Sequence, residues 1–208
     1  MIRMMAALLL LPVVARADQA VLESWLKRQA TITSLEAAFT QERRLPSLKE
    51  PVSTRGKLSV AKPDRVRWQL GEPAATIAYS DGVNFTLVDC TAKTARVVAA
   101  DSPQAARFSV LTGKGFRTVE DFNAVFEVAE HRIDSGIHQF TLKPKDRKLR
   151  AQVPWMFLHI DPKTNDLKAM EMQFKDKSRV KTVFDKPAIN PKLPDSVFKP
   201  DLTGFEMK

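Results

Sequence analysis

Cysteine is nearly absent from this chain of 208 residues, because Cys90 is the only one. A single cysteine cannot form an internal disulfide, so the core has to stabilise the fold unaided even in an oxidising compartment. We expect Cys90 to be a small, half-buried apolar residue at a strand end, and an intermolecular disulfide is the alternative. The sequence also lacks internal repeats and low-complexity tracts.

Long apolar runs are missing except at the N-terminus. Residues 4–14 are apolar, follow Arg3 and precede Ala15-Arg16-Ala17, an A-x-A pattern typical of a signal-peptidase site. We predict a signal peptide over residues 1–17, cleaved before Asp18, and a periplasmic mature protein of residues 18–208 that forms one domain. A membrane anchor is the weaker alternative, since a spanning helix needs about 20 apolar residues. We therefore expect no stable membrane insertion.

Catalytic motifs are also missing. The chain has no G-x-S-x-G nucleophile motif, and Gly113-Lys114-Gly115 lacks the pattern of a phosphate-binding loop. The three histidines show no metal-ligand spacing with one another or with Cys90; they are His131, His138 and His159. We predict that the protein is not an enzyme and needs no cofactor.

Basic residues outnumber acidic ones, which gives a formal net charge of +9. Removal of Arg3 and Arg16 with the leader lowers it to +7. Such a charge suits an anionic membrane, an acidic partner or nucleic acid, but scattered basic residues without a recognition helix argue against nucleic acid. One hypothesis places four arginines in a patch that faces a partner, and the alternative is that they are simply solvated; they are Arg43, Arg44, Arg65 and Arg67.

Alternation of apolar and polar residues is what the chain has in quantity. Val66, Trp68 and Leu70 alternate with polar residues, which is typical of a strand with one buried face. Asp81-Gly82 predicts a tight hairpin. In all we expect strands over residues 35–43, 54–61, 65–70, 76–80, 84–88, 95–98, 125–133, 137–142, 155–161, 167–175 and 180–185.

Helical spacing interrupts these strands twice. Residues 18–29 predict a helix capped by Asp18, and residues 104–111 and 118–122 predict a helical insertion with Thr118 as the second cap. The proline-rich segment from Pro187 onwards is not expected to contain a central strand, because proline donates no ladder hydrogen bond.

Together these elements predict a mainly β (α+β) fold: an unclosed, strongly curved antiparallel half-barrel of about 10–11 strands with helices on its concave side. The side chains expected to point inward would line a hydrophobic cavity, or alternatively fill a core. They are Phe39, Val66, Trp68, Ile77, Tyr79, Phe85, Phe126, Phe140, Met170 and Met172.

Short motifs in a fixed order add a resemblance to a family. Phe39-Thr40-Gln41, Gly56-Lys57-Leu58, Lys62-Pro63, Arg67-Trp68 and Ser80-Asp81-Gly82 resemble the LolA-type lipoprotein carriers of Gram-negative bacteria. The resemblance implies an α-helical lid over a cavity that binds the acyl chains of a lipoprotein cargo. It further implies an inner-membrane ABC-type lipoprotein-releasing transporter as donor and an outer-membrane receptor as acceptor, served by a monomer. The expected lid contacts come from Leu22, Trp25, Leu26, Phe108 and Leu111.

The resemblance also singles out Lys62. Carriers of this family most often have an arginine directly before the proline, where it helps to keep the lid closed. Lys62 retains the charge without the planar five-donor fork, so a latch here would be a point-charge contact. Two alternatives therefore stay open: a similar carrier of another lipid for one envelope pathway, and an exported lipid-sensing regulator, although such sensors usually carry an additional C-terminal domain.

Overall fold

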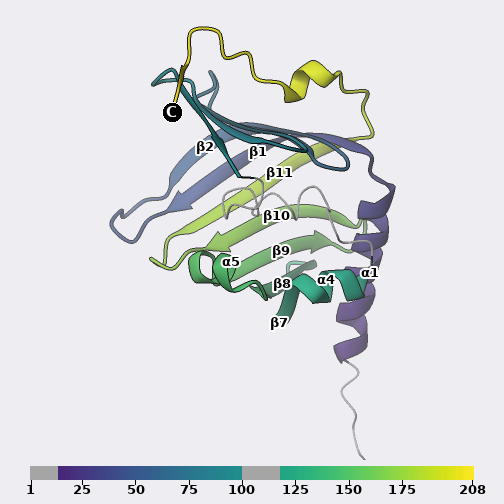
Figure 1. The fold of residues 1–208 in the computed structure, drawn as a ribbon. Helices are drawn as coiled ribbons and strands as arrows, with labels where there is room; N and C mark the ends of the chain where they lie inside the picture. The colour runs from purple at the N-terminus through teal and green to yellow at the C-terminus, as the bar shows by residue number, and fades with distance from the viewer. Residues whose placement is uncertain (1–13, 100–117) are drawn as a thin grey trace, which may run out of the picture.

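Twelve strands form one continuous sheet in the computed structural model, which describes residues 14–99 and 118–208 (Figure 1). Their order across the sheet is β12-β6-β5-β4-β3-β2-β1-β11-β10-β9-β8-β7. The bounds are β1 Ser34–Arg44, β2 Val52–Ala61, β3 Arg65–Leu70, β4 Thr76–Asp81, β5 Phe85–Asp89, β6 Thr94–Val98, β7 Phe126–Asp134, β8 Ile137–Pro144, β9 Trp155–Asp161, β10 Asp166–Gln173, β11 Arg179–Ile189 and β12 Glu206–Met207. Within the described residues β7 and β12 are the two edges and do not pair, so the sheet is unclosed.

Nearly all neighbouring strands are antiparallel, and only the two-residue β12 runs parallel to its neighbour β6. The predicted unclosed antiparallel sheet is confirmed, and β12 is the strand that the sequence did not indicate. The Asp81-Gly82 hairpin is confirmed as well. Gly82 has a φ of 96°, and the Asp81 carboxylate accepts the backbone N–H groups of Asn84 at 2.7 Å and Val83 at 2.8 Å. These two bonds, that of Asn84 first, hold the pKa of Asp81 below its ordinary value.

In the described residues three α-helices accompany the sheet: α1 Val14–Thr31, α4 Val119–Val125 and α5 Arg147–Gln152. Thr118 caps α4 as predicted, in a capping box with Asp121. The predicted start of the first helix is wrong, because α1 begins at Val14 and Asp18 lies inside it. Residues 15–17 are good helix formers, so the helix does not need to start at a cap. Helix α5 was not predicted, and the helix expected over residues 104–111 lies outside the described residues.

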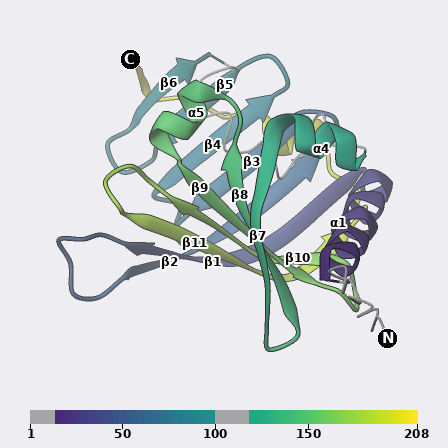
Figure 2. The same ribbon diagram turned by 90° about the horizontal axis from the view of Figure 1, so that it is seen from below.

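The two faces of the sheet carry separate buried clusters. The helix-covered cluster joins the helices to one face of β7–β10; its buried members are Leu22, Trp25, Leu26, Phe122, Phe126, Phe140, Leu142, Leu149, Val153, Met156, Leu158, Ile160, Met170 and Met172. The wall cluster lies on the same face of β1–β5 and contains Phe39, Leu58, Val60, Val66, Trp68, Ala78 and Phe85. The outer cluster lies on the other face and contains Ile77, Tyr79, Val88 and Ala95. Figure 2 shows α1 and α4 next to each other at one end of the sheet, where they make contact.

The C-terminal segment covers the outer cluster. It runs along the side of the sheet opposite the helices (Figure 1), where Leu202 and Phe205 pack on the outer cluster and Phe198 of the 3-10 helix η1 Asp195–Phe198 is buried. Pro187 corrects one expectation, because it lies inside the central strand β11. It is accommodated there because β10 pairs with β11 only as far as Val183 and the register with β1 shifts between Glu36 and Ala38.

No helix in the described part of the chain is long and apolar enough to cross a membrane.

Candidate functional site

Aromatic residues from three strands meet at the centre of the concave face. Phe39 and Trp68 stack with ring centroids 4.2 Å apart, and Phe184 of β11 packs edge-on at 6.2 Å from Phe39 and 6.4 Å from Trp68. Gly56 lies opposite Phe39 in the register of β1 and β2. A Cβ at Gly56 would overlap the Phe39 ring and the carbonyl oxygen of Gln69, so the ring packs onto bare backbone that only glycine provides.

A cavity of about 910 Å³ opens beside this aromatic group. Its apolar boundary consists of Trp68, Leu70, Ile77, Ala78, Phe85, Leu87, Val88, Ala95, Met170, Met172, Phe174 and Val180. Its polar boundary consists of Gln41, Arg43, Thr76, Asp89, Thr94, Arg96, Asp176, Ser178 and Lys208. The volume is near the upper end of the range of about 300–1,000 Å³ for small-molecule sites, and the mixed boundary suits an amphiphile.

The structure divides the predicted lining between the two concave clusters. Leu22, Trp25, Leu26, Phe126, Phe140, Met170 and Met172 belong to the helix-covered cluster, and Phe39, Val66, Trp68 and Phe85 to the wall cluster. Of these, Trp68, Phe85, Met170 and Met172 border the cavity. Phe108 and Leu111 lie outside the described residues.

Ile77 and Tyr79 correct the expected lining. Trp68 pairs with Ala78 in the register of β3 and β4, and directly opposed residues share a face, so the two flanking residues point to the other side. Their side chains pack in the outer cluster beneath the C-terminal segment, although Ile77 also reaches the cavity boundary. The alternation in β4 was identified correctly and the face was not, because the run contains apolar residues on both sides.

The four arginines of the hypothetical patch do not lie on one surface. Arg43 borders the cavity, whereas Arg65 forms an ion pair and hydrogen bond with Asp195 and lies 5.1 Å over the Phe198 ring. Arg67 lies 5.8 Å over the Tyr79 ring on the outer face, and Arg44 is exposed at the end of β1. Arg65 and Arg67 therefore hold the C-terminal segment and the outer cluster, which contradicts a single partner-facing patch.

Comparison with known proteins identifies the family. Residues 30–201 match the family described as outer membrane lipoprotein carrier protein LolA. The chain belongs to the LolA family. No match is found among curated proteins.

Two solved structures share the fold of this chain. An uncharacterized conserved protein from Thermus thermophilus is similar with a TM-score of 0.53 at 8% identity, covering 92% of this chain and 98% of that one. A DUF1329 family protein from Desulfovibrio piger is similar with a TM-score of 0.52 at 10% identity, covering 88% and 96%. At such low identity these likenesses concern the fold alone.

The C-terminal end of α1 is attached to the sheet by Lys62, the residue predicted from the sequence as a lid latch. The Lys62 ammonium group donates a hydrogen bond to the Gln29 carbonyl oxygen. The last carbonyls of a helix lack intrahelical partners and carry partial negative charge, so a lysine suits them. Lys62 thus contacts the helix expected to form the lid, and its role as a latch stays a prediction.

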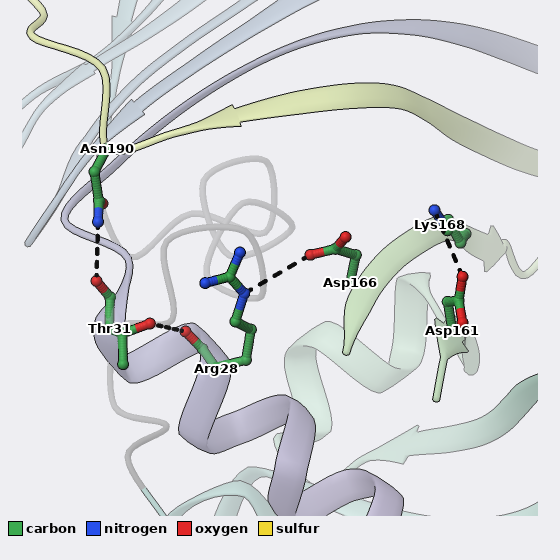
Figure 3. Close-up of polar contacts among 6 residues, drawn as sticks. All are labelled: Arg28, Thr31, Asp161, Asp166, Lys168 and Asn190. Carbon is green, nitrogen blue, oxygen red and sulfur yellow. Dashed lines mark hydrogen bonds and ion pairs between the residues drawn. The ribbon is translucent and has the colours of Figure 1, made fainter. Parts of the chain in front are cut away.

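Asn190 makes the second attachment (Figure 3). Its side-chain amide donates to the Thr31 carbonyl oxygen at 3.3 Å, and its carbonyl oxygen accepts the Thr33 backbone N–H at 2.7 Å and that of Ser34 at 3.3 Å. The Arg28 guanidinium lies 3.9 Å from the Asp166 carboxylate of β10.

The apolar face of α1 is buried, but one polar group on it lacks a hydrogen bond. Trp25 is 1% exposed and packs edge-on against Phe122 with centroids 6.2 Å apart, yet its indole N–H has no hydrogen-bond partner among the described residues. An unpaired buried donor costs about 1–3 kcal/mol. The contacts of Leu22, Trp25 and Leu26 lie in the helix-covered cluster, and none of the described residues that border the cavity comes from α1.

The histidines do not form a metal site in the described residues, where no group of three suitable ligands occurs. His131 and His138 hydrogen-bond each other at 3.0 Å between ring nitrogens. His159 is half-buried on β9, and desolvation, with smaller effects of Lys181 and Arg132, lowers its pKa to about 4. It is therefore neutral at physiological pH.

Sequence reasoning missed several residues of this site, among them Leu87, Arg96, Phe184 and Asn190. Arg96 could have been found from the register, because the predicted hairpins align Trp68, Ala78, Leu87 and Arg96 across four strands. Asn190 gave no signal, since its role depends on a φ of 56° and on contacts with residues about 157 positions away.

Proposed function

We propose that the protein is a periplasmic carrier whose cavity binds acyl chains and which moves lipoproteins from the inner to the outer membrane. Membership of the LolA family and the cavity of about 910 Å³ on the concave face support this proposal. The cavity is the observation that carries it, because a sheet side filled completely by its own residues would leave no room for cargo.

A carrier answers a specific energetic problem. Each methylene of an acyl chain costs about 0.8 kcal/mol to expose to water, so an unaccompanied acylated molecule rarely leaves a membrane. Trp68, Phe85 and Leu87 offer an apolar surface on one wall, and Met170 and Met172 offer adaptable thioether side chains on the other.

Release requires that the protein not hold its cargo too well. In this proposal α1 acts as the lid, and cargo replaces the contacts of Leu22, Trp25 and Leu26 with the helix-covered cluster. Lys62 and Asn190 retain the C-terminal end of the helix while its remainder moves. The donor would be an ABC-type lipoprotein-releasing transporter and the acceptor an outer-membrane receptor.

A second candidate function is transport of another lipid within the same architecture. Lys62 favours it, because a lysine stands where the LolA-type carriers most often have arginine, and lid closure is the property on which loading and release depend.

Native mass spectrometry and lipid extraction of the protein purified from the periplasm would test the two candidates. Acylated polypeptide in the purified protein supports lipoprotein transport, and a lipid without polypeptide supports the second candidate. A protein that emerges empty and binds no acyl probe contradicts both. Retention of residues 1–17 in the purified protein would contradict the predicted signal peptide.

A further inference from the structure

Two arginines face into the cavity. The register of β3–β6 aligns four residues across the sheet, in the order Trp68, Ala78, Leu87 and Arg96. Directly opposed residues share a face, so all four side chains lie on the concave face. Arg43 lies at two- and four-residue spacing from Gln41 and Phe39 on β1 and therefore shares that face as well. Both arginines border the same cavity from different strands.

Neither Arg43 nor Arg96 forms an ion pair within the described parts of the chain. By contrast, Arg28, Arg65 and Arg179 each pair with a carboxylate elsewhere in the molecule. Arginines that maintain the fold are thus partnered, whereas neither cavity arginine is held in a direct ion pair, although Arg43 lies near enough to Asp176 to help lower the pKa of that carboxylate.

Two carboxylates also border the cavity, and each is occupied by its own turn. Asp89 accepts the backbone N–H groups of Thr91 at 3.0 Å and Ala92 at 2.8 Å. Asp176 accepts the hydroxyl of Ser178 at 2.6 Å and its N–H at 2.9 Å, and these bonds, that of the hydroxyl first, hold its pKa below the ordinary value. These carboxylates stabilise loops, which leaves Arg43, Arg96 and Lys208 as the cations at the cavity boundary that can meet a ligand's charge.

A purely apolar cargo gives these arginines nothing to pair with. Their inward position reduces the apolar area available, and a guanidinium covered by cargo without an anionic partner would be desolvated at a cost. An amphiphile with an anionic group next to its chain removes this conflict. The arginine stems can pack along the apolar wall while the planar guanidinium groups bind a phosphate or carboxylate through paired hydrogen bonds.

We propose that the cargo is an amphiphile with an anionic headgroup, whose chain lies against Trp68, Phe85 and Leu87 and whose headgroup is bound by Arg43 and Arg96. This inference rests on the second candidate function, transport of another lipid by the same architecture, and specifies the chemistry of that cargo. It distinguishes the ligand from a neutral acylglyceryl group, which has no charge for the arginines to bind.

Binding of matched amphiphiles to the lipid-stripped mature protein tests the proposal. The probes share one saturated chain and differ in the headgroup: an alkyl phosphate, an alkyl phosphocholine and an alkyl maltoside. We expect the alkyl phosphate to bind about tenfold more tightly than the maltoside, as two charge-assisted hydrogen bonds near solvent would give. This preference should shrink at high salt.

Variants then locate the effect. Arg96→Gln and Arg43→Gln should each weaken binding of the alkyl phosphate several-fold and leave the maltoside unchanged. Arg55→Gln is the matched control, because Arg55 is exposed on β2, alternates with Gly56 and therefore lies on the outer face. It changes the net charge equally and should leave all three affinities unaltered.

The outcomes separate this inference from the carrier proposal. Equal affinities for the phosphate and the maltoside, or equal losses in Arg96→Gln and Arg55→Gln, would overturn the anionic cargo and leave the carrier function standing. Competition by inorganic phosphate at the same concentration as the alkyl phosphate would also overturn it, because it would indicate an anion site independent of the chain. Failure of every amphiphile to bind would instead refute the carrier function itself.

Discussion

The two halves of the concave face belong to the same sheet, but one is covered by helices and the other borders a cavity. Over β7–β10 the helices α1, α4 and α5 cover the strands, and Phe122, Leu142, Leu158 and Ile160 are completely buried. Over β3–β6 the wall is equally apolar in Trp68 and Phe85, yet a cavity of about 910 Å³ remains beside it.

The difference shows that one half forms a packed core and the other borders a cavity. A packed core forfeits several kcal/mol for each large side chain that it loses, so it stabilises the fold and tolerates little change. A cavity boundary gives up part of that stabilisation and can accept a ligand. Met170 and Met172 of β10 belong to the helix-covered cluster and also border the cavity, and Phe184 of β11 packs on both clusters, so β10 and β11 join the two halves.

The same substitution in each half gives the largest expected effect. Leu158→Ala removes a side chain with 0% exposure from the helix-covered cluster and should lower the free energy of unfolding by about 2–5 kcal/mol. Leu87→Ala, at a half-buried position on the cavity boundary, should cost about 1 kcal/mol or less and weaken acyl-probe binding. Urea unfolding and probe titration measure both. Equal losses of stability would contradict a division between core and cavity.

Gly56→Ala should come next, since it disturbs the wall without touching the helix-covered cluster. The new methyl group would overlap the Phe39 ring and the Gln69 carbonyl oxygen, and we expect a loss of about 1–3 kcal/mol. Adding Phe39→Leu should recover only part of this loss, because the carbonyl oxygen belongs to the backbone. If Gly56→Ala were as stable as the original protein in urea unfolding, the wall cluster would have to rearrange around the new methyl group, contrary to the packing described.

The attachment of α1 links the two halves and should show an intermediate effect. Asn190→Gly introduces a residue that tolerates a φ of 56° but loses the side-chain hydrogen bonds to Thr31, Thr33 and Ser34. We therefore expect the free energy of unfolding to fall by about 1–2 kcal/mol. Asn190→Ala should cost more, because it adds backbone strain. Hydrogen exchange over residues 27–31 should accelerate in both variants. Unchanged exchange would remove Asn190 from the attachment.

Lys62→Met tests the latch at the same end of the helix. The substitution retains an apolar stem and removes the donor to the Gln29 carbonyl oxygen, so α1 should open more readily at a cost of about 1 kcal/mol. The association rate of an acyl probe should rise in stopped-flow fluorescence, while Lys62→Arg should slow it. A rate that is identical in all three proteins would show that lid opening does not depend on this residue.

The smallest effect concerns pH and lies on the β9 strand of the helix-covered half. His159 has a pKa of about 4 in the folded protein against 6.5 for the ordinary side chain, so below pH 6.5 the unfolded state binds a proton that the folded state does not. Stability should therefore fall as the pH drops from about 6.5 to about 4, by at most about 1 kcal/mol because the ring is partly solvated. His159→Gln should flatten this part of the profile in thermal melts at several pH values. An unchanged slope would assign the acid sensitivity to other groups.

The alternation of apolar and polar residues predicted most of the sheet, because this pattern can be recognised within each strand separately. The bounds of β3 and β9 were predicted to the residue, and the Asp81-Gly82 turn followed from the φ that glycine permits. The assignment of faces failed in β4, where Ile77 and Tyr79 are apolar because the C-terminal segment covers them. Whether an apolar strand face meets a cavity or a distant part of the same chain is decided by tertiary contacts that no local period contains.

The site was harder to predict than the fold for the same reason. Trp68, Phe85, Met170 and Met172 could be found as apolar residues on alternating positions. Arg96 looked like an ordinary solvated arginine until the register placed it opposite Leu87. Lys62 was identified through the family motif, whereas Asn190, which bonds to the Thr31 carbonyl oxygen, gave no signal in the sequence.

The short strand β12 has a practical consequence for anyone who handles this protein. It pairs with β6 next to Ala95, and Lys208 directly after it borders the cavity. An affinity tag or fluorescent fusion joined after Lys208 would therefore emerge beside the opening, where a polyhistidine tail could cover the entrance or attract ligands of its own. A removable tag placed between the predicted cleavage site and Asp18 keeps that entrance free.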